Sequence, residues 1–233
     1  MLSTRSLGRL LLSACFLASA LVAAAQNKPV PDPVTQKPGM RPRPPLLYSE
    51  AWRLPPHTGE PTDENMRVTP AVVTNERIEL KVYGPDASVV RAAEHEGRID
   101  LWTGMASSPV ALTLRDRRNF VDLTDPARLS WIVRTNAIHT LHPVVKLPDG
   151  SLIVGDRQVI THGEFLRVEV AFTGMRWYGL DPKRLVVLAE VRNPDLSRVD
   201  EVGLITLAPG GGHGIAGSAN LSNVELFARP VPR

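Results

Sequence analysis

The sequence predicts an all-β protein that folds as an antiparallel β-sandwich of the jelly-roll type. Apolar and polar residues alternate in short runs, such as residues 77–83 and 165–172, and this alternation is typical of half-buried strands. Turn residues such as Asp149-Gly150 separate the runs. Helical periodicity is almost absent, which favours a sandwich or a barrel over a fold that contains helices.

The expected strands follow one another from residue 46 to residue 228. Residues 55–70 are rich in proline and polar residues and predict a long loop. Asp195 could cap a short helical segment at residues 193–199. Pro143 cannot donate to a strand ladder, so we expect its strand to lie at a sheet edge or to carry a bulge. The strands are predicted at residues 46–52, 77–83, 101–104, 110–114, 120–123, 129–134, 141–147, 165–172, 185–189, 202–207 and 221–228.

The first 25 residues have the pattern of an export signal. Arg5 and Arg9 precede an apolar run at residues 10–21, and the alanines at residues 23–25 form a cleavage site. The apolar run is too short and too rich in alanine for a comfortable transmembrane span. We therefore expect a protein that is exported to the periplasm or the extracellular space and has no span after cleavage.

Cys15 is the only cysteine and lies inside this signal. Its surroundings resemble a lipoprotein box, so lipid anchoring at Cys15 is the alternative, but the apolar run continues past it and ordinary cleavage is preferred. The chain after residue 25 then has no thiol for a disulfide or a metal site. Residues 26–45 contain seven prolines and are an expected linker, so residues 46–233 form the predicted β-sandwich domain.

The charge balance argues against a nucleic-acid partner. The formal net charge is +3, but two of the 27 basic residues are Arg5 and Arg9. Residues 1–25 contain no acidic residue, so the remaining chain has 25 basic residues against 24 acidic ones. Binding to phosphates needs a clustered excess of positive charge, which this balance does not supply.

Alternation within the central strands predicts one polar surface. If Trp131 and Val133 point into the core, Arg134 points away from it, and the same reasoning turns polar residues of the next strands outward. Charged groups beside aromatic rings suit sugar hydroxyls, although an ordinary solvated sheet face shows the same pattern. The candidate ligand-binding residues are Arg134, His142, Lys146, Arg167, Glu169, Trp177 and Tyr178.

No catalytic motif is recognisable. Sandwich glycosidases that resemble laminarinases carry the triplet Glu-x-Asp-x-x-Glu on one strand, and this triplet is missing. The flanking glycines of a serine nucleophile are also missing. The glycine-rich residues 210–214 lack the Lys-Ser/Thr ending of a phosphate loop.

Metal binding is predicted only as a possible structural calcium, and no cofactor is certain. An offset of three residues places His139 and His142 on opposite sides of a strand, which disfavours a metal pair. Carboxylates on turns could hold calcium together with backbone carbonyls, although each is first of all a turn residue. The carboxylates concerned are Asp149 and Asp156, and Asp122 and Asp125.

Residues 120–228 resemble the galactose-binding-like jelly rolls found in many carbohydrate-binding modules. The resemblance rests on Val121-Asp122-Leu123, the strand with Trp131 and Arg134, the Asp149-Gly150 hairpin, the strand at residues 165–172 and the segment at residues 199–203. Residues 193–203 are also similar to a segment of exported bacterial proteins of unknown function. The resemblance implies a saccharide on the concave sheet or on the rim loops, and often a structural calcium.

These observations lead to one hypothesis and two alternatives. We expect an exported module that binds a saccharide or cell-surface glycan without catalysis. The first alternative is a carbohydrate-active enzyme, a hydrolase or lyase, whose acid/base pair is drawn from Glu169, Asp156, His142 and His213. The second is a purely structural envelope protein. The sequence does not indicate the oligomeric state.

Overall fold

The computed structural model shows an antiparallel β-sandwich, which confirms the predicted fold class. It describes residues 43–124, 126–136, 139–208 and 217–233, so the expected signal at residues 1–25 and most of the expected linker lie outside the described residues. Within these ranges the helices are two 3₁₀ turns, η1 (Pro70–Val72) and η2 (Ala87–Val89). No helix of the described chain is long and apolar enough to cross a membrane.

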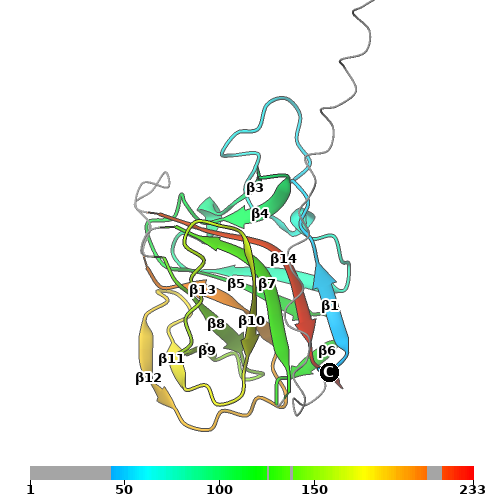
Figure 1. Ribbon diagram of the computed structural model, residues 1–233, viewed down its shortest axis with the longest axis vertical. Coiled ribbons are helices and arrows are strands. Elements are labelled where there is room, and N and C mark those ends of the chain that lie inside the picture. The colour runs from blue at the N-terminus through cyan, green and yellow to red at the C-terminus, as the bar shows by residue number, and fades with distance from the viewer. Residues whose placement is uncertain (1–42, 125, 137–138, 209–216) are drawn as a thin grey trace, which may run out of the picture.

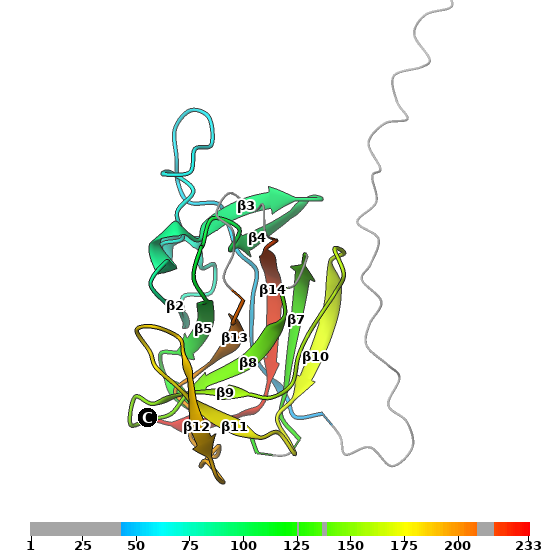
Figure 2. The same cartoon turned by 90° about the vertical axis from the view of Figure 1, so that its left-hand side faces the viewer.

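Sheet A forms one layer of the sandwich and is organised around its longest strand (Figures 1 and 2). One edge of that strand pairs with a single neighbour, while the other edge is shared by two shorter strands. In spatial order, sheet A contains β10 (Leu166–Ala171), β7 (Arg128–Thr135), β14 (Ala219–Phe227), β4 (Arg98–Trp102) and β3 (Arg91–His95), and β1 (Leu46–Glu50) also pairs with β14.

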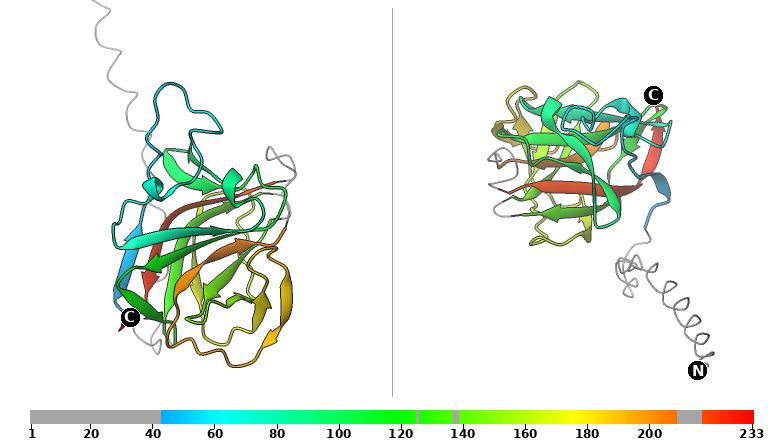
Figure 3. Two further views of the ribbon diagram at one scale, coloured as in Figure 1. Left: turned by 180° about the vertical axis from the view of Figure 1, so that it is seen from behind. Right: turned by 90° about the horizontal axis from the view of Figure 1, so that it is seen from above.

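Sheet B forms the second layer, and a two-stranded sheet C lies at the end of the sandwich where the chain terminates (Figures 1 and 3). All pairings in the three sheets are antiparallel. Sheet B has the order β12 (Val187–Val191), β11 (Trp177–Leu180), β9 (Leu152–Gly155), β8 (Leu141–Lys146), β13 (Glu201–Thr206), β5 (Val110–Asp116) and β2 (Ile78–Tyr83), and sheet C consists of β6 (Asn119–Asp122) and β15 (Arg229–Pro232).

β14 contains a bulge, and along one edge it pairs with two strands, β1 and β4. The register against β7 shifts between Leu221 and Val224, and a bulge leaves backbone carbonyls without ladder partners. Two buried tryptophans supply the missing donors: Nε1 of Trp52 donates to the carbonyls of Leu221 and Ser222, and Nε1 of Trp131 also donates to Ser222. The indole groups therefore satisfy the bulge from inside the core.

The main core lies between the two sheets. The inward residues of β7 are the ones that alternation predicts, with Leu129, Trp131 and Val133 at 0–1% exposure. Leu112 and Leu204 face them from sheet B. The strand pattern in the sequence thus predicted the inner face correctly.

A second apolar cluster covers part of the outer face of sheet B. It contains Ala111, Val144 and Ile205, with Leu185 from the β11–β12 connection. Because this cluster and the main core lie on opposite faces, β5, β8 and β13 are buried on both sides. A solvated outer face, as expected from alternation alone, is therefore wrong for the centre of this sheet.

Three local expectations are corrected by the structure. Residues 193–199 form no helix and run as an irregular segment. Residues 91–95, which were not expected as a strand, form β3. Pro143 lies in an interior strand rather than at an edge, but β9 pairs only with residues 144–146 of β8, so Pro143 sits just past the end of that ladder.

Candidate functional site

The seven candidate residues do not share one surface. Three of them, Arg134, Arg167 and Glu169, lie on β7 and β10 of sheet A, whereas the other four lie on β8 and β11 of sheet B. The prediction assumed that β7 and β8 are neighbours, but the chain crosses from one sheet to the other between them. Strand order is not encoded in alternation, so the single polar surface is wrong.

The three residues on sheet A do face outward together, as expected. Arg167 donates to Glu225 Oε2 at 2.9 Å, and Glu169 pairs with Arg43 and lies 3.5 Å from Arg128. Each of these charges already has an opposite charge beside it. A saccharide on this face would compete with ion pairs that the fold has already formed.

Arg134 belongs to a polar network that runs across four strands. Its Nη1 donates to Glu96 Oε1 at 3.0 Å and its Nε donates to Asn220 Oδ1 at 3.2 Å, while its guanidinium lies 4.6 Å from the ring centre of Phe165. Asn220 in turn donates to Asp100 Oδ1 at 2.8 Å. These contacts fix the position of Arg134.

The network ends in a histidine–aspartate pair. Nδ1 of His95 lies 2.8 Å from Oδ2 of Asp100, and the Asp100 side chain is fully buried. Burial raises the pKa of Asp100, although hydrogen bonds from Asn220 and His95 oppose the shift. The pair resembles the orienting part of a catalytic site, but no hydroxyl or thiol among the described residues bonds to His95, so it supplies no nucleophile.

His142 is buried on sheet B instead of facing solvent. Nδ1 of His142 lies 3.2 Å from the carbonyl oxygen of Gly155, and because a carbonyl only accepts, this nitrogen carries the proton. Burial lowers the pKa of His142, although this hydrogen bond and Asp156 oppose the shift. At 9% exposure the ring is not available as a flat contact surface.

Lys146 is also committed to the fold. Its ammonium donates to Glu201 Oε1 at 3.1 Å and lies 3.2 Å from the hydroxyl of Tyr83. Glu201 is 1% exposed and accepts further hydrogen bonds from Tyr83 and Thr113. Burial raises the pKa of Tyr83 to about 12. This cluster holds β2, β5, β8 and β13 together and offers no free acceptor.

Trp177 and Tyr178 leave β11 in opposite directions. Tyr178 packs against the second apolar cluster. Trp177 is 2% exposed and belongs to the main core, so neither ring stands free at a rim as expected. Trp177 nevertheless lies at the floor of the pocket described next.

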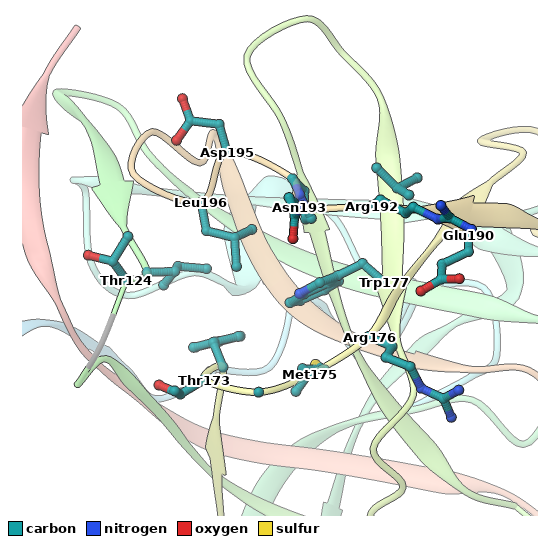
Figure 4. A pocket seen from close by; sticks show the side chains of 15 residues that line it. Thr124, Thr173, Met175, Arg176, Trp177, Glu190, Arg192, Asn193, Asp195 and Leu196 are labelled. Atoms are coloured by element: carbon teal, nitrogen blue, oxygen red, sulfur yellow. The ribbon is translucent and has the colours of Figure 1, made fainter.

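A pocket of about 510 Å³ opens where the two sheets part at one edge of the sandwich (Figure 4). We call it the edge pocket. Its floor is apolar, and exposed polar side chains stand around its mouth. The lining residues are Leu123, Thr124, Phe172, Thr173, Gly174, Met175, Arg176, Trp177, Glu190, Val191, Arg192, Asn193, Pro194, Asp195 and Leu196.

The fold positions the walls of the edge pocket through backbone contacts. Trp177 pairs with Val191 between β11 and β12, which places Arg192 and Asn193 directly after the paired strand. Asn193 has a φ of 50°, a left-handed conformation that asparagine tolerates better than most residues. The backbone N–H of Leu123 then donates to the carbonyl of Leu196 at 2.8 Å, so the loop is held against β6.

The mouth of the edge pocket carries both charge signs. Arg176 pairs with Asp156 at 3.0 Å, and this hydrogen bond, together with the charges of Tyr178, Asp156 and Glu190, raises the pKa of Arg176. The side chains of Glu190, Arg192 and Asn193 form no hydrogen bond or ion pair with another residue of the described chain. They are therefore free to bond to a ligand.

Sequence reasoning missed these three mouth residues. It assigned residues 193–199 to a turn with a capped helix and did not consider the end of the preceding strand. The available signal was three polar residues, Glu190, Arg192 and Asn193, that follow the apolar residues 185–189. Of the predicted ligand contacts, only Trp177 lines the pocket.

The expected calcium carboxylates have other partners in the structure. Asp149 and Asp122 each accept from a hydroxyl two residues ahead, Ser151 and Thr124, and Asp156 pairs with Arg176. Asp125 and the enzyme candidate His213 lie outside the described residues. No group of three or more potential metal ligands occurs in the described ranges, and the structural calcium stays a prediction.

Comparison with known proteins finds similarity only among solved structures. No protein-family model matches the sequence, and no curated protein matches it. A family 11 carbohydrate-binding module from Clostridium thermocellum, in complex with a β-1,3-1,4-mixed-linked tetrasaccharide, is 8% identical with a TM-score of 0.41 over 72% of this chain and 97% of that one. A carbohydrate-binding module is thus among the solved structures to which this chain is similar.

Two further solved structures are similar at low sequence identity and lower TM-scores. A family 28 carbohydrate-binding module specific for non-crystalline cellulose is 12% identical with a TM-score of 0.28, and the match covers 61% of this chain and 79% of the module. An exo-β-agarase is 14% identical with a TM-score of 0.37 over 68% of this chain, which spans only 24% of the agarase. Similarity at this level carries no argument about ligand or activity.

Proposed function

We propose that this protein is an exported β-sandwich that binds a saccharide in the edge pocket without catalysing a reaction. The observation that carries the proposal is the combination of an apolar floor around Trp177 with exposed hydrogen-bonding side chains at the mouth, Glu190, Arg192 and Asn193. The volume of about 510 Å³ lies within the range of small-molecule sites, about 300–1,000 Å³.

The chemistry of the mouth matches that of a sugar. Sugar hydroxyls donate and accept, so they can bond to the carboxylate of Glu190, the guanidinium of Arg192 and the amide of Asn193 at the same time. Charge-assisted hydrogen bonds of this kind are the stronger ones. The apolar C–H face of a sugar ring can pack on the floor formed by Met175 and Trp177.

The proposal is tested by affinity gel electrophoresis and calorimetry on a panel of soluble plant, algal and bacterial polysaccharides. We expect the parent to bind at least one of them, and Glu190→Ala and Arg192→Ala each to weaken that binding about tenfold, since a charge-assisted hydrogen bond contributes about 1.5–3 kcal/mol. Glu94→Ala and Arg117→Ala remove exposed charges outside the pocket and serve as matched controls with unchanged affinity.

Two results would overturn this assignment. If Arg134→Ala or Arg167→Ala abolishes binding while the pocket variants bind normally, the saccharide lies on the outer face of sheet A. If no polysaccharide of the panel binds, the protein is not a saccharide-binding module. Release of reducing sugar from a bound polysaccharide would replace the non-catalytic proposal with the enzyme alternative.

A further inference from the structure

The β11–β12 connection and β12 expose a concentrated apolar strip. Six large apolar side chains of the described chain are exposed, and three of them are consecutive: Val186 at 49%, Val187 at 42% and Leu188 at 54%. The strip lies on β12, an edge strand of sheet B at the side of the molecule (Figure 1). Val187 and Leu188 are successive residues of β12 and point to opposite faces, so this sheet edge is apolar on both faces, and exposed apolar groups gathered on a surface often mark an interaction site.

The strip is held in place by a rigid turn. The side chain of Asp181 accepts from the backbone N–H groups of Lys183 at 2.8 Å and Arg184 at 2.9 Å. The backbone closes the same turn, because Leu185 donates to the Asp181 carbonyl and Asp181 donates to the Val186 carbonyl. The exposed residues therefore belong to an ordered element of the fold.

Leu185 anchors this turn to sheet B. Its side chain is 2% exposed within the second apolar cluster, and its φ of 53° is unusual for a residue with a branched side chain. Packing of Leu185 compensates for this backbone conformation. The turn thus buries one apolar residue and leaves the next three in solvent.

Positive charge accompanies the strip. Lys183 and Arg184 immediately precede it, are exposed, and form no ion pair with another residue of the described chain. The charges of both cations also act on the Asp181 carboxylate in the same turn. Exposed apolar groups beside exposed cations match the surface of an anionic bilayer, where headgroups attract cations and the acyl region accepts apolar groups.

We propose that residues 183–188 form a membrane-contacting loop that docks on a bilayer rich in anionic lipid. Val186, Val187 and Leu188 enter the headgroup–acyl boundary, while Lys183 and Arg184 bind the lipid phosphates. A second copy of the chain is a poorer occupant, because a two-fold contact through this strip would bring the same cations close to each other. This proposal is independent of saccharide binding.

The test measures partition onto vesicles. The chain from Gln26 onward is used, because every described strand lies after residue 45 and the apolar signal segment would itself bind lipid. Sedimentation is compared for vesicles of equal parts phosphatidylglycerol and phosphatidylcholine and for pure phosphatidylcholine. We expect binding to the anionic vesicles only, and a strong loss when NaCl rises from about 0.1 M to about 1 M.

Variants separate the two contributions. Val187→Asp/Leu188→Asp removes apolar contacts and Lys183→Glu/Arg184→Glu reverses the cations, and each double variant is expected to lower partition at least about tenfold. Ile160→Asp is the matched apolar control, since Ile160 is 43% exposed elsewhere. Arg117→Glu/Arg118→Glu is the matched charge control with the same change in net charge. Both controls are expected to bind like the parent.

Three outcomes would overturn the proposal. One is equal partition of the parent and both loop variants. Another is binding that the two control variants weaken as much as the loop variants do. The last is a dimer in light scattering that Val187→Asp/Leu188→Asp dissociates, with no vesicle binding by the parent, since the strip would then be an interface between copies. Circular dichroism confirms that each variant is folded.

Discussion

The rings of Phe172 and Trp177 stack with their centres 6.4 Å apart and their planes at 12°. Phe172 directly follows β10 of sheet A, and Trp177 begins β11 of sheet B. The pair therefore joins the two layers at the point where the chain passes between them. Both side chains are 2% exposed and both line the edge pocket, so the shape of the pocket depends on the packing of the core.

Trp177→Ala is expected to destabilise the whole fold. Removing a buried indole next to Phe172 leaves a cavity, and such a change costs about 3–5 kcal/mol of unfolding free energy. Arg192→Ala changes an exposed side chain and should stay within about 0.5 kcal/mol of the parent. Urea unfolding followed by tryptophan fluorescence and circular dichroism measures both. A Trp177→Ala protein as stable as the parent would contradict the placement of this ring in the main core.

Asp100 is expected to give a pH dependence opposite to that of an ordinary surface aspartate. Its pKa is raised in the folded state, chiefly by burial. An aspartate whose pKa is raised in the folded state contributes stability below its unfolded pKa of about 3.9. This contribution is lost as pH rises through the folded pKa. The stability of the parent relative to Asp100→Asn should therefore fall as pH rises above about 4.

Asp149→Asn provides a control of opposite sign. Hydrogen bonds from Ser151 lower the pKa of Asp149, so its contribution is present above the unfolded pKa and is lost as pH falls. The stability of the parent relative to Asp149→Asn should rise as pH rises to the unfolded pKa of about 3.9 and level off above it. Urea titrations at a series of pH values measure both differences. A rise with pH for the Asp100→Asn pair as well would show that burial does not control the pKa of Asp100.

Alternation in the sequence was sufficient to predict most of the strands and the inner face of β7. Trp131 and Val133 point inward as expected, and Arg134 points outward with Arg167 and Glu169. These assignments depend only on the period of a strand, which local sequence contains. For that reason the fold class and most of the core could be predicted.

The candidate site could not be predicted, because it depends on contacts between residues distant in sequence. No local pattern shows that β8 pairs with β13 instead of β7, and this pairing removed His142 and Lys146 from the predicted surface. Likewise, His142 contacts the carbonyl of Gly155, thirteen residues later and on another strand, and local sequence does not show this contact. The edge pocket arises from three segments, around residues 123, 175 and 193, that meet only in the folded chain.

His139 and His142 are expected to lower stability in mild acid. Burial lowers the pKa of both in the folded state. The unfolded chain therefore takes up protons near its ordinary pKa of about 6.5 while the folded chain does not, so stability is lost as pH falls below that value. Each histidine adds at most about 1.4 kcal/mol per pH unit to the slope.

Glutamine variants test this slope. His139→Gln and His142→Gln should each flatten the decline of unfolding free energy between about pH 6.5 and about pH 5, and the double variant should flatten it further. His162→Gln replaces an exposed histidine and is measured beside them as the matched substitution. An unchanged slope in the double variant would show that the folded protein takes up protons at both rings as readily as the unfolded chain does.

Lys146→Met is expected to cost more stability than Glu201→Gln, although both break the same ion pair. The Glu201 carboxylate is 1% exposed, so losing the ammonium leaves a buried charge with only the hydroxyls of Tyr83 and Thr113. Breaking a buried pair in this way costs about 3–5 kcal/mol. In Glu201→Gln the remaining charge is Lys146, whose side chain is 25% exposed and can be hydrated.

The test is which variant, Lys146→Met or Glu201→Gln, loses more unfolding free energy. Equilibrium urea unfolding at neutral pH gives the free energy of each variant, and the double variant Lys146→Met/Glu201→Gln should recover much of the loss in Lys146→Met, because it removes the buried charge along with its partner. A larger loss for Glu201→Gln would mean that the hydrogen bonds of the carboxylate stabilise the sheet more than its burial destabilises it. The recovery in the double variant distinguishes these cases, since it requires that the unpaired carboxylate is the source of the cost.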